Sequence, residues 1–162
     1  AIEDGVDDLF FIDSDMQGEP EWALSILEHD VDVVGATYRK KTDDEEIYTV
    51  HTTFPIPVDP RTGLWIVQGL GTGFLRLSRK ALQALWDASE QYTNEGRICR
   101  WIFDVCPVDG KLLGEDIIAC KKLGELGFNV FLDPSMTPIH IGIKRYYGNF
   151  ASYAELLKKR AA

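Results

Sequence analysis

Residues 9–15 read Leu9-Phe10-Phe11-Ile12-Asp13-Ser14-Asp15, an apolar run that ends in two carboxylates. Such a run is typical of a strand buried on both faces, as in a parallel sheet that helices cover. Glu19 to His29 predicts a helix, because Pro20 suits a first turn and an apolar stripe follows it. Val31 to Tyr38, rich in valine, predicts a second strand. The order strand, helix, strand favours an α/β domain.

The later part of the chain continues this pattern. Ser78 is the predicted N-cap of a helix from Arg79 to about Asp87. A second helix, Gly114 to Leu126, is predicted to end at Gly127, since glycine suits the left-handed residue after a helix. Further strands are predicted at Ile47–Phe54, Leu64–Gln68 and Asn129–Leu132, together with a glycine-rich turn running into a strand at Gly69–Leu77. The charged run Arg39–Glu46 predicts a solvated loop, and the alternative is a mobile loop next to a site. An irregular segment is predicted at Pro134–Phe150 and a helix at Ala151–Arg160, with no element assigned to Gln91–Gly110.

The length and composition predict one soluble globular domain over residues 1–162, with 45% apolar and 27% charged residues. A net charge of −9 argues against general nucleic-acid binding and, more weakly, against docking on anionic membranes. No apolar run approaches the ~20 residues of a membrane span. Three sparse cysteines predict reduced thiols in a cytoplasmic protein. No signal peptide is visible, and the first predicted strand begins so early that we expect further residues upstream.

Asp13 and Asp15 carry the strongest chemical signal. Side chains at i and i+2 of a strand point the same way, so both carboxylates are expected to face one spot past the strand end. Open α/β sheets bind their ligands at that edge. Mg²⁺ and Mn²⁺ favour oxygen ligands and commonly bridge carboxylates to phosphates. The alternative is a polar turn that happens to contain two aspartates.

Glu115 and Asp116 open a predicted helix, and either carboxylate is a candidate general base for an acceptor hydroxyl. The alternative is structural, because the helix dipole favours acidic residues there by ~0.3–1 kcal/mol. His140 lies between two isoleucines and is a candidate metal ligand beside Asp15, or else a core histidine. Nitrogen ligation would favour Mn²⁺ modestly over Mg²⁺.

Two further groups are candidate binding residues. Lys144, Arg145, Tyr146 and Tyr147 could close over a diphosphate and stabilise its charge, or form an exposed basic loop. Gly69-Leu70-Gly71-Thr72-Gly73-Phe74 is not a dinucleotide fingerprint, because Phe74 stands where a third glycine is needed and a strand, not a helix, follows. Small residues there would let a substrate approach the backbone, and Trp65 would offer a flat face to a sugar. The alternative is that the glycine-rich turn and Trp65 are packing features.

Together these motifs resemble the catalytic half of a GT-A fold glycosyltransferase of the family 2-like type. The shared order is Asp-x-Asp at a strand end, Gly71-Thr72-Gly73-Phe74, Gly114-Glu115-Asp116 and His140-Ile141-Gly142, within about Asp7 to Gly148. The resemblance implies a Rossmann-like mixed sheet flanked by helices. It also implies a nucleotide-sugar donor, by preference a UDP-sugar, and a hydroxyl acceptor on a glycan, lipid or protein.

The resemblance assigns roles to individual residues. It implies that Asp15 and His140 bind Mn²⁺ or Mg²⁺ directly, and that Asp13 lies near the ribose or a metal-bound water. Ser14 lies between the two aspartates and belongs to the same cofactor-binding group. Asp116 matches the catalytic base of inverting members. Such domains usually begin with strands that bind the nucleobase, and these are missing here, so we expect an N-terminally incomplete domain.

Two other functions fit parts of the pattern. A phosphatase of the haloacid dehalogenase type also carries Asp-x-Asp after an apolar strand, with Asp13 then the nucleophile. Gly114-Glu115-Asp116 matches the acidic signature of that class poorly. A non-catalytic nucleotide- or carbohydrate-binding module would keep the fold without turnover.

Overall fold

A five-stranded mixed sheet lies at the centre of the computed structural model, which describes residues 1–43 and 45–161. The strand order is β1-β7-β3-β12-β5. Strands β1, β3 and β12 run in one direction, because β7 is antiparallel to both β1 and β3 and β12 is parallel to β3. Strand β5 closes the far edge as an antiparallel partner of β12. The predicted α/β class is confirmed, and the carboxyl ends of β1, β3 and β12 share one edge.

Four helices and several two- or three-stranded sheets surround this sheet. The central strands are β1 (Asp8–Ile12), β3 (Val33–Gly35), β5 (Trp65–Val67), β7 (Phe74–Ser78) and β12 (Val130–Leu132). The smaller strands are β2 (Met16–Gln17), β4 (Val50–His51), β6 (Gly69–Leu70), β8 (Gln91–Asn94), β9 (Arg97–Arg100), β10 (Cys106–Val108), β11 (Lys111–Leu113), β13 (Ile139–Ile141) and β14 (Arg145–Tyr146). The helices are α1 (Pro20–Glu28), α2 (Arg79–Ala88), α3 (Glu115–Glu125) and α4 (Phe150–Ala161). None of the described helices is both long and apolar enough to cross a membrane.

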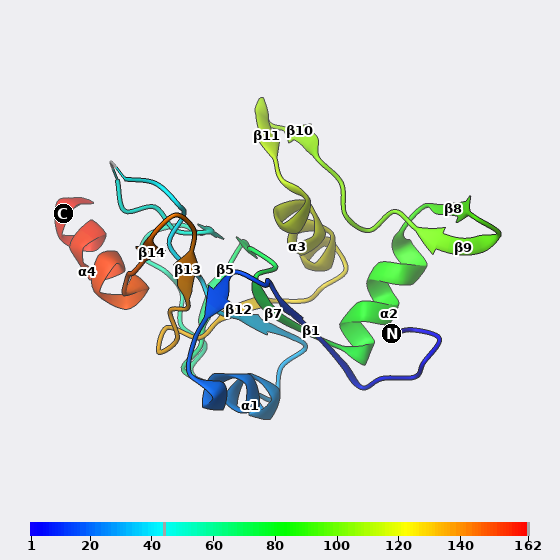
Figure 1. Cartoon of the computed structure of the whole chain (residues 1–162), viewed down its shortest axis with the longest axis horizontal. Helices are drawn as coiled ribbons and strands as arrows, with labels where there is room; N and C mark the ends of the chain where they lie inside the picture. The colour runs from blue at the N-terminus through cyan, green and yellow to red at the C-terminus, as the bar shows by residue number, and fades with distance from the viewer. Residues whose placement is uncertain (44, 162) are drawn as a thin grey trace.

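The two faces of the sheet bury different apolar clusters, as the alternation of side chains along a strand requires. Ile26 of α1 packs with Val34 and Phe131 on one face. Helices α2, α3 and α4 pack on the other face, around Val33, Leu132 and their neighbours. Figure 1 shows α1 on one side of the sheet and α2 and α3 on the opposite side. Helices therefore cover both faces of the sheet.

Strand β1 differs from its prediction. It lies at the edge of the sheet and pairs with β7 alone, and Ile12 at its end is 54% exposed. The prediction of a strand buried on both faces and paired in parallel was therefore wrong. The apolar run reflects packing of Phe10 and Phe11 on opposite sides of an edge strand.

Helix and cap predictions agree closely with the structure. Ser78 caps α2 by accepting a hydrogen bond from the Ala81 amide at 3.2 Å, and Gly127 follows α3 with a φ of +88°. The segment Pro134–Phe150 was wrongly predicted to be irregular throughout, because it contains β13 and β14. These strands have three and two residues, too few for a periodic signal.

Candidate functional site

The Asp13–Met16 turn carries the chain out of the central sheet at the carboxyl end of β1. The Asp13 amide donates to the Gly73 carbonyl at 3.1 Å, and the Met16 amide donates back to the Asp13 carbonyl at 3.0 Å. Asp13 and Ser14 are exposed and Asp15 is half-buried. Because these residues form a turn, the alternation rule behind the sequence prediction does not apply to Asp13 and Asp15.

Asp15 and His140 are brought together by a small sheet of order β14-β13-β2 (Figure 1). His140 lies opposite Met16 in this sheet, and the Ile141 amide donates to the Asp15 carbonyl at 2.8 Å. His140 Nε2 consequently lies 3.5 Å from Asp15 Oδ2. The structure thus places two of the predicted metal ligands side by side, although 124 residues separate them in the sequence.

The hydrogen bond on the other ring nitrogen of His140 determines what Nε2 can do. Nδ1 lies 3.0 Å from the Arg39 carbonyl, which can only accept, so Nδ1 carries a proton. In the neutral ring Nε2 then has a bare lone pair that faces an anionic oxygen. A ring nitrogen and a carboxylate oxygen at this spacing are a donor pair that fits a divalent metal accepting both types.

Asp13 is not gathered with this pair. Among residues 1–43 and 45–161, no group of three His, Cys, Asp or Glu side chains is arranged to hold a metal. Asp15 and His140 are thus a two-residue donor set to which Asp13 is adjacent in sequence. Direct ligation by Asp13 stays a prediction.

Lys41 is a third partner at this position that the sequence did not indicate. Its Nζ lies 2.5 Å from Asp15 Oδ2. The ammonium is the main reason that the pKa of Asp15 lies below its usual value. Lys41 belongs to the charged run expected to be a solvated loop, in which no pattern distinguishes it from Lys40.

Asp116 lies in the first turn of α3 and lines a cavity of about 550 Å³ together with Lys40, His51 and Lys111. Its Oδ1 accepts a hydrogen bond from the Ile117 amide at 2.8 Å. Burial raises the pKa of Asp116, and the charge of Glu115 adds to this effect. Glu115 itself is exposed and does not line the cavity, so Asp116 is the better placed of the two candidate bases.

Tyr38 contacts both the glycine-rich turn and His140, and sequence reasoning missed it. Its hydroxyl oxygen accepts a hydrogen bond from the Gly73 amide at 3.1 Å, and its ring packs edge-on against His140 at 5.1 Å. Burial raises the pKa of Tyr38 to about 12, and the charges of Asp13 and Asp116 both contribute.

The glycine-rich turn owes its composition to Tyr38. A Cβ at Gly73 would lie 2.6 Å from the Tyr38 hydroxyl, and one at Gly71 would lie 2.5 Å from it. Both glycines are buried, and Thr72 between them is partly buried. Packing against Tyr38 explains the two glycines, and the predicted contact of Gly71, Thr72 and Gly73 with a substrate stays a prediction.

The remaining candidates lie further out. Trp65 is on β5, at the opposite edge of the sheet from β1, where its ring packs against Phe150 at 5.8 Å. Lys144 is in the exposed loop between β13 and β14, where it pairs with Asp43. Tyr147 is 57% exposed and its carbonyl accepts a hydrogen bond from Arg39. The structure shows no hydrogen bond or ion pair of Lys144, Tyr147 or Trp65 with Asp15 or His140 within the described residues, and their roles in binding stay predictions.

Comparison with solved structures found similarity to A197 from STIV, with a TM-score of 0.51 and 20% sequence identity. The match covers 87% of this chain and 61% of that chain, so this chain spans about three fifths of the length of A197. At this identity the likeness concerns the fold alone. Scans of protein-family models and of curated proteins returned no match.

Proposed function

We propose that this chain is the catalytic part of a metal-dependent glycosyltransferase with a GT-A-like fold. It transfers a sugar from a nucleotide-sugar donor, by preference a UDP-sugar, to an acceptor hydroxyl. The observation that carries the proposal is the close approach of Asp15 and His140 beside the carboxyl end of β1, with Tyr38 packed against the His140 ring. Open α/β sheets bind ligands at this edge.

Asp15 and His140 would hold Mn²⁺ or Mg²⁺, with Asp13 beside them. A bound cation supplies positive charge to the diphosphate as the sugar leaves. Lys144, just before β14, and Tyr147, just after it, would add a cation and a hydrogen-bond donor for the same phosphates. The chain's own contribution is to orient these groups through the pairing of β13 with β2.

Asp116 would take the proton from the acceptor hydroxyl as its oxygen attacks the sugar carbon. Burial supports this role, because it makes the carboxylate a stronger base than an exposed aspartate. The cavity of about 550 Å³ in front of Asp116 has room for the acceptor group.

The test is an incubation with Mn²⁺ and a panel of UDP- and GDP-sugars, with released nucleoside diphosphate and glycosylated acceptor as the readouts. We expect turnover of at least one donor, and its loss when the cation is chelated. Phosphate release from p-nitrophenyl phosphate without turnover of any nucleotide sugar would overturn the proposal in favour of a phosphatase. Nucleotide binding without either reaction would indicate a binding module.

A further inference from the structure

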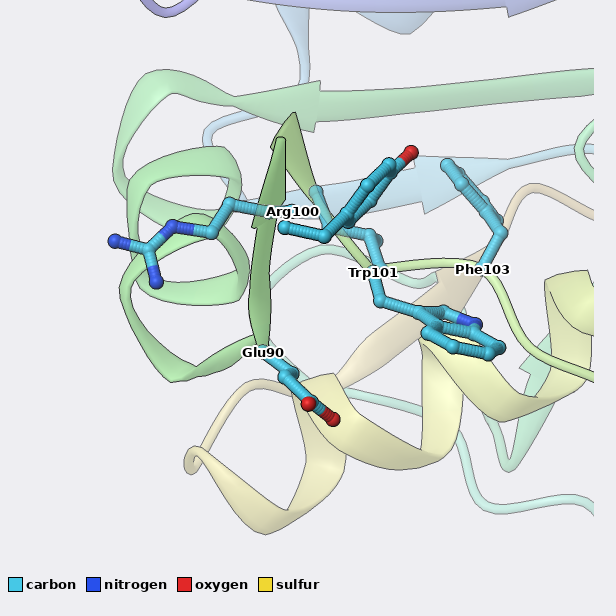
Figure 2. Close-up of a pocket in the computed structure, with 6 residues that line it drawn as sticks. Glu90, Arg100, Trp101 and Phe103 are labelled. Carbon is cyan, nitrogen blue, oxygen red and sulfur yellow. The ribbon is translucent and has the colours of Figure 1, made fainter. Parts of the chain in front are cut away.

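An aromatic cavity of about 530 Å³ lies beside the hairpin of β8 and β9. Its lining consists of Glu90, Tyr92, Arg100, Trp101, Ile102 and Phe103. Figure 2 shows the rings of Trp101 and Phe103 projecting to one side, the guanidinium of Arg100 pointing the opposite way, and the Glu90 carboxylate below the indole. None of these residues belongs to the site described above.

The segment that carries the rings is held on the same frame as the candidate base. Lys122 of α3 donates hydrogen bonds to the Trp101 carbonyl at 3.0 Å and the Ile102 carbonyl at 2.9 Å. Lys122 lies six residues after Asp116, which is about 9 Å along a helix axis. Helix α3 therefore carries Asp116 and also anchors the segment that forms the cavity wall.

The cavity also borders the strand that leads to the Asp13–Met16 turn. The Phe103 ring packs edge-on against Phe11 of β1 at 5.9 Å. Asp13 follows Phe11 by two residues, roughly 7 Å further along an extended chain. The cavity wall therefore lies against the strand that ends just before Asp13.

Three aromatic rings of the cavity are substantially exposed. Tyr92 is 48% exposed, Trp101 50% and Phe103 39%. Arg100 braces the wall from behind, since it donates to the Ser89 carbonyl at 3.0 Å and its guanidinium lies 5.7 Å from the Trp86 ring. Rigid, half-exposed aromatic rings beside a carboxylate are the materials of a binding site for an amphipathic ligand.

We propose that this cavity binds a neutral sugar ring of the acceptor, stacked on Trp101 with its hydroxyls donating to Glu90. This inference rests on the proposed glycosyltransferase function, because only that function makes the bound sugar an acceptor. It names the chemical class of that acceptor. A pyranose has apolar faces that match aromatic rings and an edge of hydroxyl donors. An ionised carboxylate only accepts hydrogen bonds, so hydroxyl groups complement it.

The charges at the cavity argue against other occupants. A lipid chain would bury Glu90 without a partner, which costs free energy. An anionic ligand would face the carboxylate of Glu90 on a chain with a net charge of −9, while the guanidinium of Arg100 is directed away from the rings. A neutral polyhydroxylated ring meets neither difficulty.

The experiment uses the whole chain labelled with 5-fluorotryptophan, whose four tryptophans give separate fluorine signals. The Trp101→Phe variant assigns the Trp101 signal. The probes are cellobiose, maltose, lactose and chitobiose, with phosphatidylcholine vesicles as the apolar comparison. We expect at least one disaccharide to shift the Trp101 signal selectively, with a Kd in the millimolar range, and Glu90→Gln to weaken this binding several-fold. Ile98→Ala, at an exposed hairpin position outside the cavity, is the matched control and should bind normally.

Two outcomes would overturn the inference: no disaccharide shifts the Trp101 signal, or vesicles shift it and sugars do not. The assay does not depend on turnover, so it is separable from the proposed function. If nucleotide sugars are turned over and Trp101→Ala leaves the acceptor KM unchanged, the inference fails and the glycosyltransferase proposal stands. If disaccharides bind at Trp101 and no donor is turned over, the sugar site stands and the glycosyltransferase proposal fails.

Discussion

Asp15 has competing partners, because Lys41 contacts the same Oδ2 atom that lies 3.5 Å from His140 Nε2. A cation that binds Asp15 must displace the Lys41 ammonium. We expect Lys41→Gln to tighten Mn²⁺ binding and to bring the pKa of Asp15 back toward 3.8, since Lys41 is the main cause of its lowering. We expect His140→Ala to weaken Mn²⁺ binding by about 10-fold or more.

Electron paramagnetic resonance of free Mn²⁺ measures the change in Mn²⁺ binding of the Lys41→Gln and His140→Ala variants. Lys40→Gln removes the same charge from the neighbouring position and is the control, because Lys40 lines the other cavity. Weaker Mn²⁺ binding in Lys41→Gln would mean that the lysine supports the cation site instead of competing with it.

Substitution of Asp116 by asparagine should lower the rate of sugar transfer and raise the stability of the fold at neutral pH. Asp116→Asn removes the proposed base, so we expect transfer to fall by about 10²–10⁴-fold while UDP binding persists. Burial raises the pKa of Asp116 in the folded chain. A raised carboxyl pKa means that the stabilisation is complete below the unfolded value of 3.8 and is lost as the pH rises through the folded value. Asp116→Asn should therefore be more stable than the wild type at neutral pH, but not below pH 3.8.

Urea unfolding at the two pH values measures this difference, and Glu115→Gln is the neighbouring control for activity. A variant that keeps its transfer rate would remove Asp116 from the mechanism. An Asp116→Asn variant that is less stable than the wild type at neutral pH would show that the fold favours the ionised carboxylate of Asp116.

Gly73 should tolerate no side chain, because a Cβ there would lie within 2.6 to 2.8 Å of Tyr38 atoms. We expect Gly73→Ala to cost about 1–3 kcal/mol of unfolding free energy. Gly124→Ala is the control with the opposite sign, since nothing lies within 4 Å in the α3 helix and alanine should gain about 0.5–1 kcal/mol. A double-mutant cycle with Tyr38→Ala should recover most of the Gly73 cost. No coupling in that cycle would contradict the packing account.

At the scale of single elements, α2 begins with a cap that can be tested directly. Ser78 Oγ accepts from the Ala81 amide at 3.2 Å and donates to Asp32 Oδ1 at 2.7 Å. We expect Ser78→Ala to lose about 1 kcal/mol of unfolding free energy, because the amide is left without its partner. Ser78→Thr keeps the hydroxyl and should lose little. Equal losses in both variants, measured by chemical denaturation, would assign the effect to crowding.

Elements with strong local signals were predictable from the sequence, and elements that depend on distant partners were not. Pro20 and Ser78 mark helix starts through local chemistry. The hairpin of β10 and β11 turns at Asp109 and Gly110, both with positive φ, an Asp-Gly signal that the sequence offered and that was overlooked. Strand β13 has three residues and exists because β2 pairs with it, so no local pattern predicts it.

The residues of the candidate site also fall into those that a local sequence motif indicates and those that only tertiary contacts reveal. Asp15, Asp116 and His140 were found because each stands in a recognisable motif. Tyr38 and Lys41 were missed because their roles come from tertiary contacts, with Gly73 and Asp15 respectively. Single-sequence patterns report which residues can do chemistry, and only the fold reports which ones meet.

For the whole molecule, the charge balance predicts sensitivity to acid. Hydrogen bonds hold the pKa of Asp15 and of Asp59 below the usual value, from Lys41 and Thr62 respectively. At Asp32 burial acts in the opposite direction, but hydrogen bonds from Ser78 and Lys80 outweigh it. Carboxyls with lowered pKa values stabilise the fold above 3.8, and this contribution is lost as the pH falls below that value.

We therefore expect the Tm to fall below pH 3.8, with Asp116 opposing the trend in part. A thermal scan across that range measures the slope. Asp59→Asn should flatten it slightly, because one of the responsible carboxyls is gone. A Tm that is unchanged or rises on acidification would contradict these pKa directions.

The pairing of β2 with β13 also bears on how the protein is made. Asp15 leaves the ribosome among the first residues of this sequence, and His140 follows only after 124 more have been added. Domains fold as units during synthesis, at about 5–20 residues per second. Throughout the synthesis of those residues the nascent chain has Asp15 without His140. A cation site built from this pair would therefore assemble only after His140 has emerged.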